Sequence, residues 1–235
     1  MKLLRYGTKG QEKPGLLDHE GAIRDLSSLT GDFSAETLSA DLERLQGVDP
    51  TTLPRVPGNV RVGPCVGRVG KFICIGLNYA DHAAEPGASV PEEPVIFSKA
   101  TSAISGPFDD VELPPGSSKT DWEVELGVVI GAHAKHVTET EALEFVAGYC
   151  VVNDLSEREY QLERSGQWVK GKSYDTFGPI GPYLVTTNEI PYPQNLRLEG
   201  VLEIPPGIAA FQWTANSLSS SAVGCQLISN SSGLR

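Results

Sequence analysis

Short apolar runs separated by turn residues dominate the N-terminal part of the chain, positions 1–60. The leucines between Ser34 and Leu45 recur at helical spacing, and Ser34 has the residue type of an N-cap, so this segment predicts a helix. Three other runs have the length of strands: Lys2–Tyr6, Gly15–Leu17 and Ala22–Leu26. Together these segments predict a small N-terminal α/β domain at 1–60.

Residues 53–70 interrupt this pattern, because they contain three prolines and four glycines and no amphipathic period. We therefore expect a boundary here and a second domain at 61–198. That part alternates strand-like apolar runs with Gly/Pro-rich loops, which predicts an α+β fold that is mainly β. The expected strands are Phe72–Ile75, Pro94–Phe97, Trp122–Ile130, Tyr149–Asn153 and Pro182–Thr186, and the expected helices are Asn78–Glu85, Glu139–Val146 and Ser156–Glu163.

The C-terminal segment, 199–235, differs from the rest of the chain. Between Ile204 and Arg235 the only charged side chain is that of Arg235, and serine fills seven of the last twenty positions. This composition shows no sustained strand alternation. We expect a divergent, poorly ordered tail that packs weakly against the second domain.

Charge and composition narrow the function. The 235 residues carry 19 Lys and Arg against 30 Asp and Glu, and a net charge of -11 repels phosphate backbones, so we expect no nucleic-acid partner. No apolar run reaches the roughly 18 residues of a membrane span, and the start of the chain is charged too soon for a signal peptide. We therefore expect no membrane partner and a cytoplasmic location. The four cysteines lack metal or redox spacing and predict idle or buried thiols.

Two carboxylates on the run 121–130 are the main chemical signal. In a strand, Glu123 and Glu125 project from the same face about 6–7 Å apart at Cα, and they repel each other unless a positive group lies between them. Oxygen ligands favour Mg²⁺, then Mn²⁺ or Ca²⁺. The alternative is a half-exposed strand with two solvated glutamates. Asp154, at the end of the strand 149–154, is a candidate third ligand or the N-cap of the next helix.

A histidine and a glutamate on the segment 78–85 form a second candidate. His82 and Glu85 stand three residues apart on one predicted helix face, where a carboxylate raises the basicity of an imidazole and prepares it as a general base. The alternative is a pair of solvent-exposed neighbours.

The segment 166–173 matches the phosphate-binding pattern G-x-x-x-x-G-K-[ST]. That loop needs a buried strand before it and a long helix after it, and the sequence predicts neither. Lys172 is therefore either a positive group in an anionic site or a surface charge.

Five blocks of the sequence together resemble the fumarylacetoacetate hydrolase family of metal-dependent enzymes that act on 2-oxo acids and related compounds. The resemblance covers about Val69 to Leu198, and the segment 1–60 resembles the small N-terminal domain of bacterial members. The blocks are Gly76–Glu85, Pro94–Phe97 with Lys99, Asp121–Gly131, Gly148–Asp154 with Arg158, and Lys170–Pro179.

The resemblance implies roles for eight residues. Glu123, Glu125 and Asp154 would bind the metal ion, and His82 with Glu85 would activate water. Lys172 would be the positive group at the substrate or its enolate. Arg158 and Gln161 would lie near the substrate.

The same resemblance implies Mg²⁺ as the cofactor, with Mn²⁺ or Ca²⁺ as alternatives, and a homodimer. The substrate would be a small 2-oxo or 2-hydroxy acid or dicarboxylate. The sequence does not separate C–C hydrolysis, isomerisation, decarboxylation and ureidoglycolate lyase chemistry, because all of these reactions use an enolate or a polarised carbonyl group. Family members continue beyond the equivalent of Leu198 with a different sequence, so we expect a frameshifted or misjoined end. The alternative function is a truncated, inactive family member.

Overall fold

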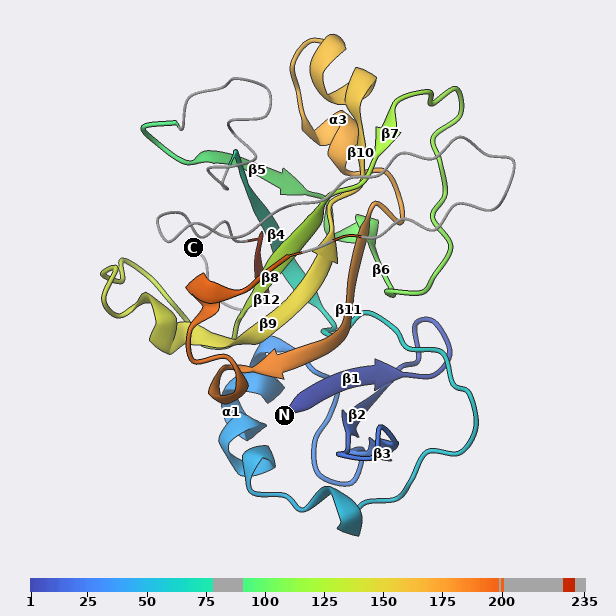
Figure 1. The fold of residues 1–235 in the computed structure, drawn as a ribbon, viewed down its shortest axis with the longest axis vertical. Helices are drawn as coiled ribbons and strands as arrows, with labels where there is room; N and C mark the ends of the chain where they lie inside the picture. Colours follow the sequence, from blue (N-terminus) through green and yellow to red (C-terminus); the bar gives the residue numbers. More distant parts are fainter. Residues whose placement is uncertain (78–90, 199, 201–225, 231–235) are drawn as a thin grey trace.

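The computed structural model describes residues 1–77, 91–198, 200 and 226–230. In this part of the chain one ten-stranded sheet forms the centre of the molecule, and a two-stranded sheet lies at its upper end (Figure 1). The strands of the large sheet are β1 (Lys2–Tyr6), β2 (Lys13–Leu17), β3 (Ile23–Asp25), β4 (Val69–Gly76), β5 (Val95–Lys99), β6 (Ile104–Ser105), β8 (Val124–Ile130), β9 (Val146–Asn153), β11 (Gly178–Thr186) and β12 (Gln226–Asn230). The small sheet pairs β7 (Thr120–Asp121) with β10 (Ser156–Glu157). The α-helices are α1 (Ala35–Gln46) and α3 (Val169–Lys172).

The large sheet crosses the boundary expected near residue 60. Its strand order is β3-β2-β1-β11-β9-β8-β12-β4-β5, and β1 joins the rest by pairing antiparallel with β11. One hydrophobic core also spans both parts, because Leu3, Phe33 and Leu38 belong to the same cluster of buried side chains as Phe72 and Ile180. The small N-terminal unit is therefore continuous with the second one, while the boundary itself stays a prediction.

Most elements expected in the N-terminal unit and around the site are present. The mainly β, α+β class is confirmed by the strands and by the short helices. Helix α1 begins directly after Ser34, which is its N-cap, and the Ser34 amide donates to Thr37 Oγ1 over 2.9 Å. Local patterns predicted these elements correctly because apolar alternation and caps act over short stretches of chain.

Two expected helices are wrong in part. At 139–146 only a 3₁₀ turn, Ala142–Phe145, forms, although Thr138 donates to Glu141 as the capping pattern predicts. The turn ends there because Val146 already pairs with Ile130 of β8. At 156–163 the first two positions form β10, and only Glu159–Glu163 is helical, as a π-helical turn.

The tail, which we expect to be divergent and poorly ordered, contributes one described strand, β12. This strand lies between β8 and β4 and pairs parallel with β8 and antiparallel with β4. The backbone edges of β8 and β4 that face each other can hydrogen-bond to any extended segment placed between them. The composition of the tail alone does not show that these edges need a partner strand. The remainder of the tail, apart from 200, lies outside the described residues.

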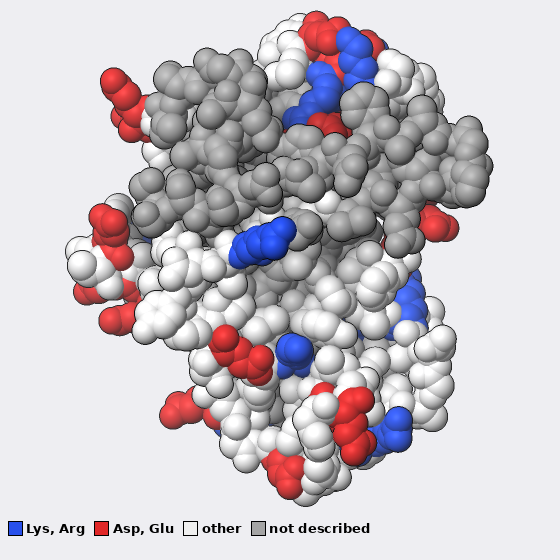
Figure 2. Space-filling view, viewed as in Figure 1, with Lys and Arg blue, Asp and Glu red and all other residues white. Residues whose placement is uncertain are grey.

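The surface and the thiols agree with the composition. Cys65, Cys74 and Cys150 are buried thiols. On the face shown in Figure 2, the described positive side chains lie scattered among negative ones, with the densest mixture at the upper end. Within the described residues no helix has the length and apolarity needed to cross a membrane.

Candidate active site

The candidate site lies at the upper end of the molecule, where α3, β7 and β10 meet the ends of the large sheet (Figure 1). The ends of four elements, β5, β8, β9 and α3, assemble it. Residue 123 lies directly before β8, Asp154 directly after β9, and their backbones join through the Asp154 amide and the Glu123 carbonyl over 2.8 Å. Lys99 ends β5, and Lys172 ends α3. Antiparallel pairing of β8 with β9 thus brings together two carboxylates that are far apart in the sequence.

Six charged side chains of alternating sign form a continuous row at this end, which we call the charge row: Lys99, Asp154, Lys172, Glu123, Arg158 and Asp121. Lys99 Nζ lies 2.5 Å from Asp154 Oδ1, and Lys172 Nζ lies 2.7 Å from Asp154 Oδ2. The same Lys172 nitrogen is 2.6 Å from Glu123 Oε2. Arg158 Nη2 then joins Glu123 Oε1 at 2.9 Å to Asp121 Oδ2 at 2.6 Å. The row thus alternates three basic with three acidic side chains.

The charge row runs from the interior to the surface. The exposed fraction of the side chains is 0% at Lys99, 2% at Asp154 and 3% at Lys172, and it rises to 17% at Glu123, 27% at Arg158 and 45% at Asp121. Fully buried lysines are rare unless they are paired. The Asp121 end therefore meets solvent, and the Lys99 end closes the row inside the protein.

Burial and neighbouring charges shift the pKa values along the row. Burial alone would raise the pKa of Glu123, but the positive charges of Lys172 and Arg158 lower it to about 2. Burial opposes protonation of Lys172, yet Asp154 and Glu123 raise its pKa overall. At Lys99 burial is the stronger effect and lowers the pKa. Glu123 and Lys172 are thus held in their charged forms at neutral pH.

The two residues expected near the substrate lie together. Arg158 Nη1 donates to Gln161 Oε1 over 3.0 Å, and Gln161 is buried. Arg158 also contacts Glu123, one of the carboxylates expected to bind metal, and so links Gln161 to that carboxylate. Gly171 allows this packing: a Cβ there would collide with the Glu157 carbonyl oxygen and would lie 2.6 Å from the Gln161 amide nitrogen.

The remaining expected residues are placed less completely. Glu125 lies in β8, opposite Val152 of β9. His82 and Glu85 lie outside the described residues. Within the ranges the structure describes, no three His, Cys, Asp or Glu side chains are arranged to hold a metal ion. The donor chemistry nevertheless fits a hard divalent cation, because oxygens of Glu123 and Asp154 converge on one positively charged point.

The phosphate-loop pattern at 166–173 does not form a phosphate-binding loop. Residues 169–172 make a single helical turn, and β11 follows it rather than a long helix. The ammonium of Lys172 is held by two carboxylates. The structure thus agrees with the rejection of a nucleotide site.

Sequence reasoning gave no role to Lys99 or Asp121. A signal for Lys99 was available: Val95, Phe97 and Lys99 share one face of β5, and a lysine on the inward face of a strand needs a buried anion. Asp121 carried no local signal, because its link to Arg158 spans 37 positions.

Comparisons with known proteins show the same fold and family. Residues 71–203 match the family model described as the fumarylacetoacetate (FAA) hydrolase C-terminal domain. A protein of Burkholderia multivorans that bears only the general name hydrolase is 66% identical over 199 residues, which are 84% of this chain and 71% of that protein.

Two solved structures are similar to this chain. The fumarylacetoacetate hydrolase of Exiguobacterium antarcticum is 34% identical with a TM-score of 0.65, over 80% of this chain and 67% of that one. The maleylpyruvate hydrolase of Sphingobium sp. SYK-6, solved in complex with manganese(II) and pyruvate, is 27% identical with a TM-score of 0.66, over 83% and 70%.

Both similar solved structures named above are hydrolases, and both share the mainly β fold of this chain. The chain belongs to the fumarylacetoacetate hydrolase family.

Proposed function

We propose that this chain is a metal-dependent hydrolase that cleaves a C–C bond in a small acylpyruvate or related 2-oxo dicarboxylate. The observation that carries the proposal is that the carboxylates of Glu123 and Asp154 both contact the buried ammonium of Lys172. Arg158 lies beside them, in contact with Glu123. The manganese and pyruvate in the similar maleylpyruvate hydrolase support both the ion class and the 2-oxo acid.

In this proposal Glu123, Glu125 and Asp154 hold the divalent ion, Mg²⁺ first and Mn²⁺ or Ca²⁺ as alternatives. When bound, such an ion polarises carbonyl oxygens and offsets negative charge that develops on them. Arg158 and Gln161 bind the substrate carboxylate, since a guanidinium and an amide are both hydrogen-bond donors and Arg158 joins Gln161 to Glu123.

The chemical step needs a base and a positive group. His82, with Glu85, takes a proton from water, whose oxygen attacks the acyl carbonyl carbon. The C–C bond to the pyruvyl carbon then breaks, and its electron pair leaves as the enolate of pyruvate. Lys172 stabilises that negative charge. Protonation of the enolate completes the reaction, so acetylpyruvate and water give acetate and pyruvate.

Turnover of acetylpyruvate by the purified full chain tests the proposal. We expect activity with MgCl₂ or MnCl₂ and its loss with EDTA, measured by the fall in diketone absorbance and by pyruvate release. A folded chain that releases no pyruvate with either ion would contradict the proposal and favour the inactive family member. A homodimer and a cytoplasmic location remain expectations from the family and the composition.

A further inference from the structure

Glu157 is a fully buried carboxylate that the proposed mechanism does not use. Its residue is 0% exposed, and it forms the second position of β10. An ionised carboxylate inside a protein needs hydrogen bonds or a cation to offset the loss of water. The hydrogen-bond partners of Glu157 therefore indicate the role of its side chain.

Main-chain amides supply those hydrogen bonds. Glu157 Oε2 accepts from the Tyr160 amide over 2.7 Å, and Oε1 accepts from the Lys119 amide over 3.0 Å and from Ser117 Oγ over 3.4 Å. Burial would raise the pKa of Glu157, but the backbone donors lower it overall. The ionised side chain thus ties segment 117–119 to the π-helical turn that begins at Glu159.

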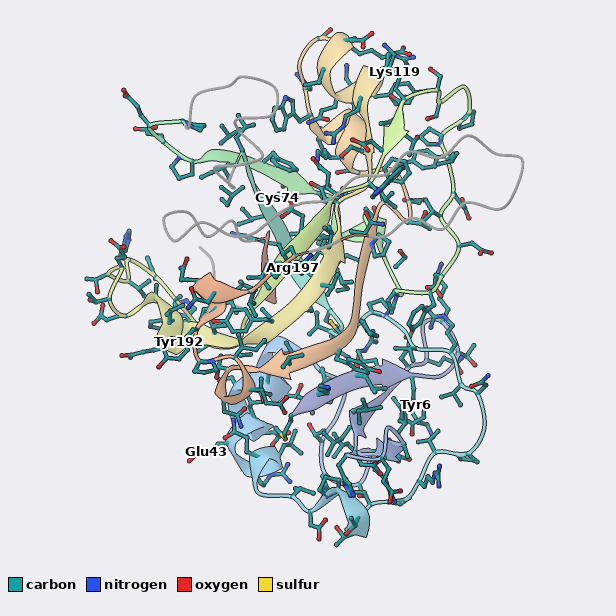
Figure 3. The ribbon with its side chains drawn as sticks, in the orientation of Figure 1. Tyr6, Glu43, Cys74, Lys119, Tyr192 and Arg197 are labelled. Atoms are coloured by element: carbon teal, nitrogen blue, oxygen red, sulfur yellow. The ribbon has the colours of Figure 1, made fainter. Side chains whose placement is uncertain are left out.

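The two segments that Glu157 joins carry the polar groups expected to meet the substrate. Arg158 follows Glu157 directly, and its amide donates to the Lys119 carbonyl over 2.9 Å. Gln161 lies one residue beyond Tyr160 in the turn that Glu157 anchors. On the other side, segment 117–119 leads into β7 and Asp121, which holds the Arg158 guanidinium. Figure 3 labels Lys119 at this end of the molecule.

We propose that Glu157 is a positioning residue that fixes Arg158 and Gln161 in the arrangement that receives the carboxylate of a 2-oxo acid. The inference rests on the proposed function, which it extends from residues that touch the substrate to the one that holds them. No covalent step involves Glu157, so its effect falls on substrate binding.

Replacing Glu157 with glutamine tests the charge and the hydrogen bonds of the side chain while its volume stays nearly constant. Glutamine has only one side-chain oxygen, so its NH₂ group must face either the Tyr160 or the Lys119 amide donor. One segment is then released. For Glu157→Gln we expect the KM for acetylpyruvate to rise by about tenfold, the loss typical of one charged hydrogen bond, with kcat within about threefold of the original.

Glu163→Gln is the matched control. Glu163 joins the same two segments, but through the exposed side chain of Lys119 at 2.5 Å rather than through a main-chain amide. We expect its KM and kcat to be unchanged. Glu157→Asp keeps the charge but is one methylene too short to reach both amides, and we expect its KM to rise as well. Thermal melting of each full-length variant shows whether it is folded.

The results separate the inference from the proposed function. A folded Glu157→Gln chain with unchanged KM, or with a loss confined to kcat, overturns the inference alone. If neither variant at position 157 folds, Glu157 is a structural residue and the inference is wrong. If the unmodified, folded chain neither turns over acetylpyruvate nor binds pyruvate by calorimetry with MgCl₂, the proposed function is wrong. The inference about Glu157, which rests on that function, is then wrong as well.

Discussion

The ammonium of Lys99 lies 2.5 Å from Oδ1 of Asp154, and the two side chains are 0% and 2% exposed. Lys99 also donates to the Leu155 carbonyl over 2.9 Å. A charge so far from solvent is strongly unfavourable unless it is compensated, and Asp154 is compensated by two lysines, Lys99 and Lys172. The pair therefore joins the edge strand β5 to the end of β9.

Removing Lys99 tests this relationship. For Lys99→Met we expect the free energy of unfolding to fall by about 1.5–3 kcal/mol, because Asp154 loses a charged hydrogen bond but keeps its ion pair with Lys172. Lys119→Met is the control, because its pair with Glu163 is exposed at both ends and should change stability by less than about 1 kcal/mol. Urea titrations measure both. Equally small losses of unfolding free energy in the two variants would show that the buried Lys99 pair stabilises the fold no more than the exposed pair does.

The proposed metal site predicts a loss of metal-dependent stability in Glu125→Ala. Mg²⁺ should raise the melting temperature of the unmodified chain, because a ligand that binds only the folded state stabilises it. The two carboxylates left in the variant hold a hard ion poorly, so the rise should disappear. Glu144→Ala, at an exposed position, should keep it. Unchanged stabilisation in Glu125→Ala would remove this residue from the proposed ligand set.

The proposed base predicts a kinetic effect without loss of metal. His82→Ala should lower turnover of acetylpyruvate by about 10²-fold or more, the contribution typical of a general base. Its Mg²⁺-dependent rise in melting temperature should remain. His19→Ala, at an exposed turn of the N-terminal unit, should leave both quantities unchanged. Parallel loss of turnover and metal stabilisation would make His82 a ligand or a structural residue.

The low pKa of Glu123 predicts how stability depends on pH. Glu123 binds a proton near pH 2 in the folded chain and near its ordinary value of 4.5 when unfolded. Its contribution to stability is complete above about pH 4.5 and is lost as the pH falls towards 2. Other carboxylates titrate in this range too, so the comparison is with Glu123→Gln. We expect unfolding free energy to fall less steeply over this range in Glu123→Gln than in the unmodified chain or Glu144→Gln, and parallel curves would contradict the assignment.

Gly171 predicts a steric effect on the site. In Gly171→Ala the new Cβ meets backbone atoms of Glu157 and Gln161, which cannot turn away, so α3 and Lys172 must shift. We expect a stability loss of about 1–3 kcal/mol and reduced turnover. In Gly47→Ala the nearest atom is 3.7 Å away, and we expect almost no change in either measurement. Crystal structures of the two variants with unmoved α3 would contradict this account.

The sequence predicted local features of the fold better than contacts between distant segments. The strands around 2–6, 72–75 and 149–153 and the helix capped by Ser34 follow from patterns within short windows of the chain. The helix expected at 139–146 shortened to one turn because β8 pairs with Val146 and draws it into the sheet. Pairing of that kind depends on partners elsewhere in the chain, which single-segment periodicity does not contain.

The residues of the candidate site also divide into those that the sequence predicted and those that it did not. The carboxylates Glu123 and Asp154, with Lys172, were identified from residue type and from the resemblance, and the structure brings these three together. Glu157 was missed because it stands in a segment predicted to be a helix, where an acidic residue is ordinarily solvated. Its burial follows from the pairing of β10 with β7, and that pairing joins segments that are distant in the sequence.

The place of β12 also determines when the sheet can be completed. As the chain leaves the ribosome, β4 and β8 emerge well before 226–230, and each then has a bare backbone edge towards the other. Two open edges on a nascent chain are sites where strands of another molecule can bind, because main-chain hydrogen bonds discriminate little between sequences. The gap between β8 and β4, near the β5 end of the sheet, thus closes only after 226–230 has emerged, so the order of translation sets the time at which this contact can form.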